Sequence, residues 1–137
     1  MQIVLYCDYD NYFSHEPVRL FTVKEAIDFV HQYHGIACLA HPWLCSDPTS
    51  VCKQAIELGI DGLECFPPKH YESYGTEEYV DIAKEHHLVC SSGSDFHSEV
   101  NCEVDVGENV YPKVYAEEFL CHLKKQNIIY SCFLPHQ

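Results

Sequence analysis

The chain has 137 residues, of which 47% are hydrophobic and 13% aromatic, a composition that predicts one compact domain with its own core rather than a membrane protein. Its formal net charge of −13 comes from 21 acidic against 8 basic residues, which argues against stable binding of duplex nucleic acid. No apolar stretch approaches the roughly 20 residues of a membrane-spanning helix, and the first residues lack the basic segment of a secretion signal, so we expect a cytoplasmic protein without membrane contact.

Helical and strand patterns alternate along the chain. Thr22 followed by Glu25 has the spacing of a capping box and marks the first helix start. The first apolar run should end as a strand at His41-Pro42, because proline cannot continue a β ladder. The predicted helices are 23–33, 48–58, 79–86 (with Thr76 before it) and 115–126, and the predicted strands are 36–40, 61–66, 88–92 and 128–133.

This alternation with short connections favours parallel strands joined by right-handed crossovers, and therefore an α/β fold. Functional groups in such sheets and barrels gather at the carboxyl ends of the strands, where loops vary without disturbing the core. Polar side chains are therefore of most interest where each predicted strand ends.

Histidines and an aspartate follow three successive strands. His41 directly follows the first, His70 lies in the loop after the second, and Asp95 and His97 follow the third. Side chains two apart in extended backbone point to one side, so Asp95 and His97 can face one cavity. Gly93 is expected to let the backbone turn as it leaves the sheet.

Imidazole and carboxylate groups together suit zinc, manganese or iron, and a site with an open position can activate water. A single histidine is more often an ordinary surface residue, but three at equivalent strand ends with an aspartate favour a divalent metal site. A flavodoxin-like open sheet with scattered histidines stays open as an alternative.

Other chemistries have less support in the sequence. Phe96 stands where a cysteine-dependent phosphatase loop would need arginine, and Ser92 and Ser94 are not in a G-x-S-x-G elbow. Glycine-rich nucleotide-binding loops are absent from the sequence.

The nine cysteines form no C-x-x-C pair, which indicates neither a zinc ribbon nor a closed disulfide framework and favours a reducing compartment. Cys38, Cys65 and Cys90 lie inside apolar runs, where we expect small buried hydrophobes rather than metal ligands.

Three segments, AIDFVHQYHGIACLAHP, LGIDGLECFPPKH and YVDIAKEHHLVCSSGSDFH, resemble in order and spacing the second half of a PHP (polymerase and histidinol phosphatase) domain. Within that family they resemble the small stand-alone metal-dependent phosphoesterases. The resemblance covers about residues 12–97 and implies that 1–137 is a single partial PHP domain. The implied fold is part of a distorted (β/α)7 barrel, with about four βα units and a trinuclear metal cluster at the carboxyl rim.

The resemblance also implies roles for individual residues. The implied metal ligands are His41 and His70 on one metal, Asp95 on a second and His97 on a third, and the catalytic residues are Asp95 and His97. Glu64 matches a position that contacts a ligand or the substrate, and Lys69 beside His70 could contact phosphate. The implied reaction is hydrolysis of small phosphate esters, nucleotides or oligonucleotide 5′ ends by water activated on divalent Mn, Zn or Fe.

The sequence also departs from the family pattern. The family opens with an H-x-H pair and further ligands, whereas MQIVLYCDYDN contains no histidine. Trp43 replaces the small residue usual after AHP. The chain is also shorter than the roughly 250 residues of a complete (β/α)8 barrel. We therefore expect a hydrolase that needs a missing N-terminal half, a partner or a second copy; the alternative is a non-catalytic PHP-like binding or assembly module, as a fragment or degenerate remnant.

Overall fold

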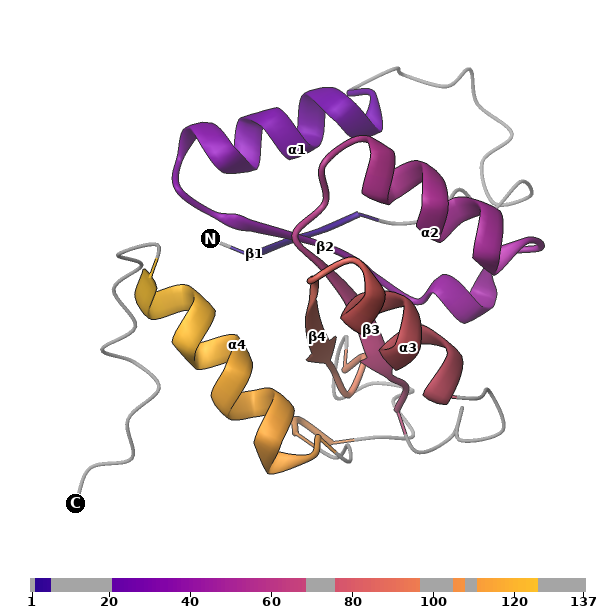
Figure 1. The fold of residues 1–137 in the computed structure, drawn as a ribbon, viewed down its shortest axis with the longest axis vertical. Coiled ribbons are helices and arrows are strands. Elements are labelled where there is room, and N and C mark those ends of the chain that lie inside the picture. Colours follow the sequence, from indigo (N-terminus) through magenta and orange to yellow (C-terminus); the bar gives the residue numbers. More distant parts are fainter. Residues whose placement is uncertain (1, 6–20, 69–75, 97–104, 108–110, 126–137) are drawn as a thin grey trace.

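The computed structural model describes residues 2–5, 21–68, 76–96, 105–107 and 111–125 (Figure 1). Within these ranges strands and helices alternate, as the sequence predicts. The strands are β1 (Gln2–Leu5), β2 (Ile36–Leu39), β3 (Gly62–Phe66) and β4 (Val89–Ser92). The helices are α1 (Val23–Gln32), α2 (Pro48–Glu57), α3 (Glu77–Glu85) and α4 (Lys113–Lys125), with a 3-10 helix, η1, at Pro42–Leu44.

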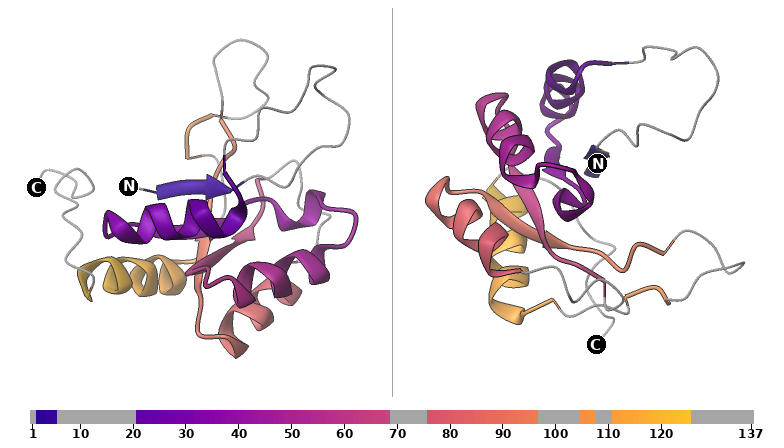
Figure 2. Two further views of the ribbon diagram at one scale, coloured as in Figure 1. Left: turned by 90° about the horizontal axis from the view of Figure 1, so that it is seen from above. Right: turned by 90° about the vertical axis from the view of Figure 1, so that its right-hand side faces the viewer.

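The four strands form one open sheet in the order β1-β2-β3-β4, and every neighbouring pair is parallel. The predicted α/β class is therefore confirmed, and three of the predicted strands correspond to β2, β3 and β4. The sequence did not predict β1, which pairs with β2 and lies at one edge beside α1 (Figure 2). The predicted strand at 128–133 lies outside the described residues.

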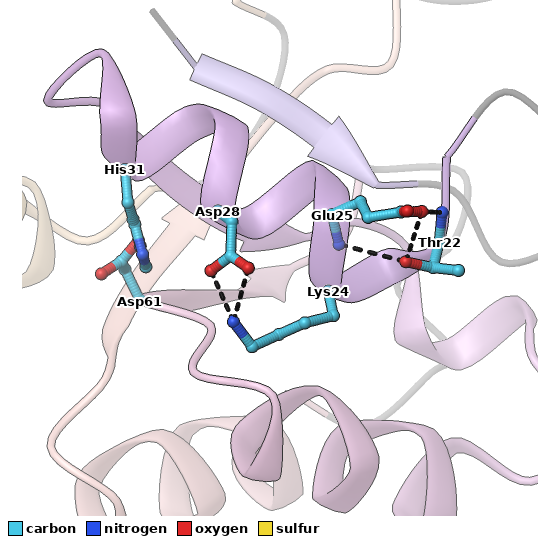
Figure 3. A network of polar contacts seen from close by, with 6 residues as sticks. All are labelled: Thr22, Lys24, Glu25, Asp28, His31 and Asp61. Atoms are coloured by element: carbon cyan, nitrogen blue, oxygen red, sulfur yellow. Dashed lines mark hydrogen bonds and ion pairs between the residues drawn. The ribbon is translucent and has the colours of Figure 1, made fainter.

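Local side-chain contacts explain where the first two helices begin. The Thr22 Oγ1 accepts the Glu25 amide at 3.1 Å and the Glu25 carboxylate accepts the Thr22 amide at 2.7 Å, which is the predicted capping box (Figure 3). The Asp47 carboxylate accepts the Ser50 amide at 3.1 Å, and Pro48 occupies the first turn of α2. Each contact satisfies a helix N–H group that would otherwise lack a partner.

A polar contact joins the end of α1 to the sheet. His31 Nε2, in the last turn of α1, lies 2.7 Å from Asp61 Oδ2 (Figure 3), and the same oxygen accepts the Ala37 amide of β2 at 2.8 Å. Because Asp61 immediately precedes β3, this carboxylate links α1 to the beginnings of two strands.

The sheet is covered on both faces. Apolar residues of α1, α2 and α3 pack with alternate strand residues, including Ala37, Leu39 and Leu63, in the main core. On the opposite face, Phe119 and Leu123 of α4 pack against Ile36, Cys38 and Val89, so the strands lie between α4 and the other three helices (Figure 1). Because residues of a strand alternate between its faces, one apolar run supplies both cores.

α4 contacts both ends of the strands. Phe119 and Leu123 pack on Ile36 and Val89, which begin β2 and β4. Near the start of the helix, the ring of Tyr115 lies 5.1 Å from that of Phe66, the last residue of β3. None of the helices in the described ranges is long and apolar enough to cross a membrane.

The cysteine predictions are confirmed in part. Cys38, Cys65 and Cys90 are buried free thiols, as expected from their apolar surroundings. Burial raises the pKa of Cys38 to about 12, so its thiol stays protonated. Cys45, in contrast, is disulfide-bonded. The sequence did not indicate this bond, because spacing alone does not show which thiols meet.

Two histidines occupy left-handed positions after helices. His34 and His87, with φ of 56° and 57°, follow α1 and α3 at the place that Gly59, with φ of 91°, occupies after α2. In each case the next residue donates its amide to a carbonyl five residues earlier, as in a Schellman motif. A residue with a Cβ pays for this conformation, whereas glycine does not.

Replacing His34 or His87 with glycine is therefore expected to raise the free energy of unfolding by about 0.5–1 kcal/mol each. Urea titration of the two variants measures this. Gly59→Ala is the matched control and should lower stability by about 1 kcal/mol, because no heavy atom lies within 4 Å of the added Cβ and only the backbone conformation is unfavourable. Destabilisation by either glycine variant would contradict the prediction.

Candidate metal centre

His41 lies where the sequence placed it, just after β2 at the carboxyl end of the sheet. It precedes η1, whose first residue is Pro42, and its backbone is left-handed with φ of 43° and ψ of 48°. Its side chain is only 13% exposed. The turn made by His41 and Pro42 thus directs the imidazole back over the strand ends instead of continuing the strand.

Asp95 lies three residues beyond β4 and is also left-handed, with φ of 56°. We expected Gly93 to supply the conformational freedom for this turn, but the positive φ belongs to Asp95. Gly93 instead leaves room, because a Cβ there would lie 3.3 Å from Glu64 Oε1. A larger residue at this position would therefore require Glu64 to shift by a few tenths of an ångström.

Two residues at this rim have a left-handed backbone that no helix end explains. In the described residues, four non-glycine residues have positive φ, and two of them, His34 and His87, end helices. The other two are His41 and Asp95, which face each other. Unfavourable backbone conformations that local helix-end hydrogen bonds do not explain gather at functional sites, so the strain singles out this pair independently of its chemistry.

The two side chains meet directly. His41 Nε2 lies 3.3 Å from Asp95 Oδ1, and their side chains are 13% and 21% exposed. Two donors bound at about 2.1 Å to one tetrahedral zinc ion would lie about 3.4 Å apart. The observed spacing fits a shared cation as well as a direct ion pair, so the donor chemistry of this pair is compatible with a metal.

Glu64, on β3, is the third side chain of this group. It is 7% exposed, its Oε2 accepts the His41 amide at 3.0 Å, and the same oxygen is 3.7 Å from His41 Nε2. Burial raises the pKa of Glu64 to about 7; the amides of His41 and Gly93 oppose the rise and the charge of Asp95 adds to it. A buried carboxyl group that can ionise near neutral pH is typical of a functional site.

This pKa predicts the pH dependence of stability in the metal-free protein. Between pH 4.5 and 7 the folded state holds a proton on Glu64 that the unfolded chain releases. The protonated Glu64 therefore contributes its full share to the free energy of unfolding below pH 4.5, and this contribution is lost as the pH rises through 7. Glutamine at position 64 cannot ionise. Between pH 4.5 and 8 the wild type should therefore lose about 3 kcal/mol of unfolding free energy relative to Glu64→Gln. Urea titrations in chelator measure it, and a flat difference would contradict the prediction.

Trp43 packs against the His41 ring. This residue, the single tryptophan of the chain, is 4% exposed, and its ring meets the His41 and Tyr79 rings edge-on at centroid distances of 6.0 and 6.1 Å. Within the described part of the chain, the buried Nε1 of Trp43 has no hydrogen-bond partner. The sequence showed that Trp43 is bulkier than usual here, but its contact with His41 required the structure.

The structure therefore brings together His41, Asp95 and Glu64 of the predicted site. His70, His97 and Lys69 lie outside the described residues. Among the residues that are described, no set of three or more His, Cys, Asp and Glu side chains is arranged to hold a metal ion. The fit to a metal thus rests on the paired donors His41 and Asp95.

Comparison with known proteins gives distant and partial similarity to phosphoesterases. No protein-family model matches the chain. Over 87 residues the chain is 31% identical to a phosphoribosyl 1,2-cyclic phosphate 1,2-diphosphodiesterase from Eggerthella lenta, which covers 64% of this chain and 32% of the relative. The chain thus spans about a third of the length of that curated relative.

A solved structure shares the fold. It comes from Bifidobacterium adolescentis and is described as a candidate metal-dependent phosphoesterase, with a TM-score of 0.57 and 24% sequence identity. The match covers 82% of this chain and 40% of that protein. The open parallel sheet described above therefore matches part of the fold of that protein.

Proposed function

We propose that this chain carries part of the active site of a PHP-type metal-dependent phosphoesterase, which hydrolyses small phosphate esters or nucleotides. The observation that carries this proposal is the 3.3 Å approach of His41 Nε2 to Asp95 Oδ1 between two left-handed residues at the carboxyl rim. The distant similarity to a cyclic phosphate diphosphodiesterase favours a phosphorylated small molecule as substrate.

The ligands would be His41 and Asp95 together with His70 and His97, and divalent Mn, Zn or Fe would supply a Lewis acid and activated water when bound. His41 offers a neutral imidazole nitrogen and Asp95 a carboxylate oxygen, the donor types these ions prefer. Asp95 is also placed to accept a proton from a water molecule at the rim. Lys69 would contact the phosphate group.

The other protein groups shape the site. Trp43 walls off one side of His41, which restricts solvent and fixes the ring orientation. We further propose that turnover requires the N-terminal ligand positions of a PHP domain, which the sequence of this chain does not supply.

A non-catalytic PHP-like binding module is the second candidate. It is favoured by the sequence MQIVLYCDYDN, which contains no histidine where the PHP family has an H-x-H pair of metal ligands. Such a module would bind its metal or its partner without releasing phosphate.

The first experiment uses the single tryptophan as a reporter. Mn²⁺ bound by His41 would be close to the Trp43 ring, so titration with Mn²⁺ is expected to quench its fluorescence with saturation, and prior addition of Zn²⁺ should prevent the quenching. Asp28→Asn, which changes an exposed carboxylate on α1, is the matched control and should titrate like the wild type.

Phosphate release from a generic aryl phosphate with added Mn²⁺ then separates the two candidates. Turnover by a full-length protein that includes the N-terminal ligand positions supports the enzyme. Saturable quenching without turnover in that protein supports a metal-binding module, and the absence of saturable quenching in both proteins contradicts the enzyme and the metal-binding module alike.

A further inference from the structure

One buried carboxylate reaches both loops that form the rim. Glu64 lies on β3, between β2 and β4 in the sheet. Its Oε2 accepts the amide of His41 after β2 at 3.0 Å. Its Oε1 lies close to Gly93 after β4, whose backbone amide lowers the pKa of the same carboxyl group. Three consecutive strand ends therefore meet at a single side chain.

The space around this side chain is closely fitted. Gly93 is the residue whose missing Cβ leaves room for Glu64 Oε1, at 3.3 Å. Glu64 and Ser91 are the two buried polar residues in the described part of the chain, but the Ser91 hydroxyl donates within the sheet, to the Leu63 carbonyl at 3.3 Å. Of these two, only Glu64 contacts the loops.

Stability alone does not account for a carboxylate in this place. Removing a charged group from water is costly, and two backbone amides compensate for this only in part. The same two amides, however, belong to the loops that carry His41 and Asp95. Holding both amides on one rigid acceptor fixes the distance between the loops.

We propose that Glu64 is a positioning residue, whose carboxylate ties the loop after β2 to the loop after β4 so that His41 and Asp95 face each other. Its consequence for metal binding rests on the proposed function, but the tie between the loops does not.

The test compares Glu64→Ala and Glu64→Gln with Ser91→Ala, which removes a buried polar group from the neighbouring strand without touching the loops. Amide hydrogen exchange at His41 and Gly93 is measured relative to the amide of Ala37, which donates to Asp61. Alanine at position 64 is expected to speed exchange at both amides by about tenfold or more. Glutamine has one acceptor oxygen and should preserve one bond only.

Metal binding provides the second readout. Mn²⁺ quenching of Trp43 is expected to require about 10–100-fold more metal in Glu64→Ala, whereas Ser91→Ala should titrate like the wild type. Gly93→Ala, whose Cβ would press on Oε1, should weaken binding in the same direction.

Unchanged exchange at both amides in Glu64→Ala would overturn the proposal. So would complete loss of metal binding in Glu64→Gln with wild-type exchange at both amides, because that would make Glu64 a direct ligand. If wild-type Trp43 does not respond to Mn²⁺, the proposed function loses its support, and the exchange measurement alone decides whether Glu64 ties the loops.

Discussion

Asp95→Asn is expected to abolish metal-dependent phosphate release and to weaken Mn²⁺ binding by at least about 100-fold. Asparagine keeps the size of the side chain and tolerates the left-handed backbone that Asp95 adopts, with φ of 56°. It removes the negative charge and replaces one carboxylate oxygen with a donor group, so its amide oxygen is a poorer partner for a cation next to His41 Nε2. Trp43 quenching and phosphate release measure the two effects.

Asp95→Gly separates this functional loss from an effect on folding. Glycine has no penalty at positive φ, so this variant should be about as stable as the wild type or more stable by up to about 1 kcal/mol, while metal binding is still lost. A stable Asp95→Gly or Asp95→Asn protein that binds Mn²⁺ like the wild type would remove Asp95 from the site. Asp28→Asn again serves as the exposed-carboxylate control.

Gly62→Ala is expected to cause the largest loss of stability, about 3 kcal/mol or a fall in Tm on the order of 10 °C. The added Cβ would lie 2.6 Å from Val89 Cγ2, 2.7 Å from the Val89 carbonyl oxygen and 2.8 Å from Cys38 Sγ. The side chains can move, but the carbonyl belongs to the backbone of β4. The alanine therefore forces the neighbouring strand away from β3, and thermal unfolding followed by circular dichroism measures the cost.

Two further variants identify the cause of this loss. Gly107→Ala adds a Cβ with no heavy atom within 4 Å at φ of 78°, so it should cost only the backbone term of about 1 kcal/mol. Adding Val89→Ala to Gly62→Ala removes the methyl contact but leaves the carbonyl contact, so recovery should be absent or partial. If Gly62→Ala is as stable as Gly107→Ala, the strands around Gly62 are packed less tightly than these distances indicate, and the prediction is wrong.

The left-handed residues at the helix ends and those at the rim differ in what they contribute. His34 and His87 adopt left-handed conformations with the hydrogen bonds of helix ends, and glycine is expected to improve both positions. His41 and Asp95 adopt the same conformation where it brings an imidazole and a carboxylate together. Glycine at Asp95 is expected to relieve the strain and remove the chemistry, as is usual where strain serves a site.

The sequence by itself determined the order and the limits of most elements. Thr22 and Glu25 fix the start of α1, and the helices and strands begin and end close to the predicted residues because caps, proline and apolar periodicity are local properties. It also placed His41 and Asp95 after parallel strands, whose carboxyl ends necessarily share one rim. The resemblance of AHP and GSDFH to a phosphoesterase family then predicted metal-dependent hydrolysis of phosphate esters.

Only the tertiary structure decided which residues meet. The apolar face of α4 could have packed on either side of the sheet, and Phe119 and Leu123 lie opposite the other three helices. The short β1 is a strand because it pairs with β2. The close fit of Gly62, the space left by Gly93 and the reach of Glu64 to two loops all depend on contacts between residues far apart in the chain, which no local pattern encodes.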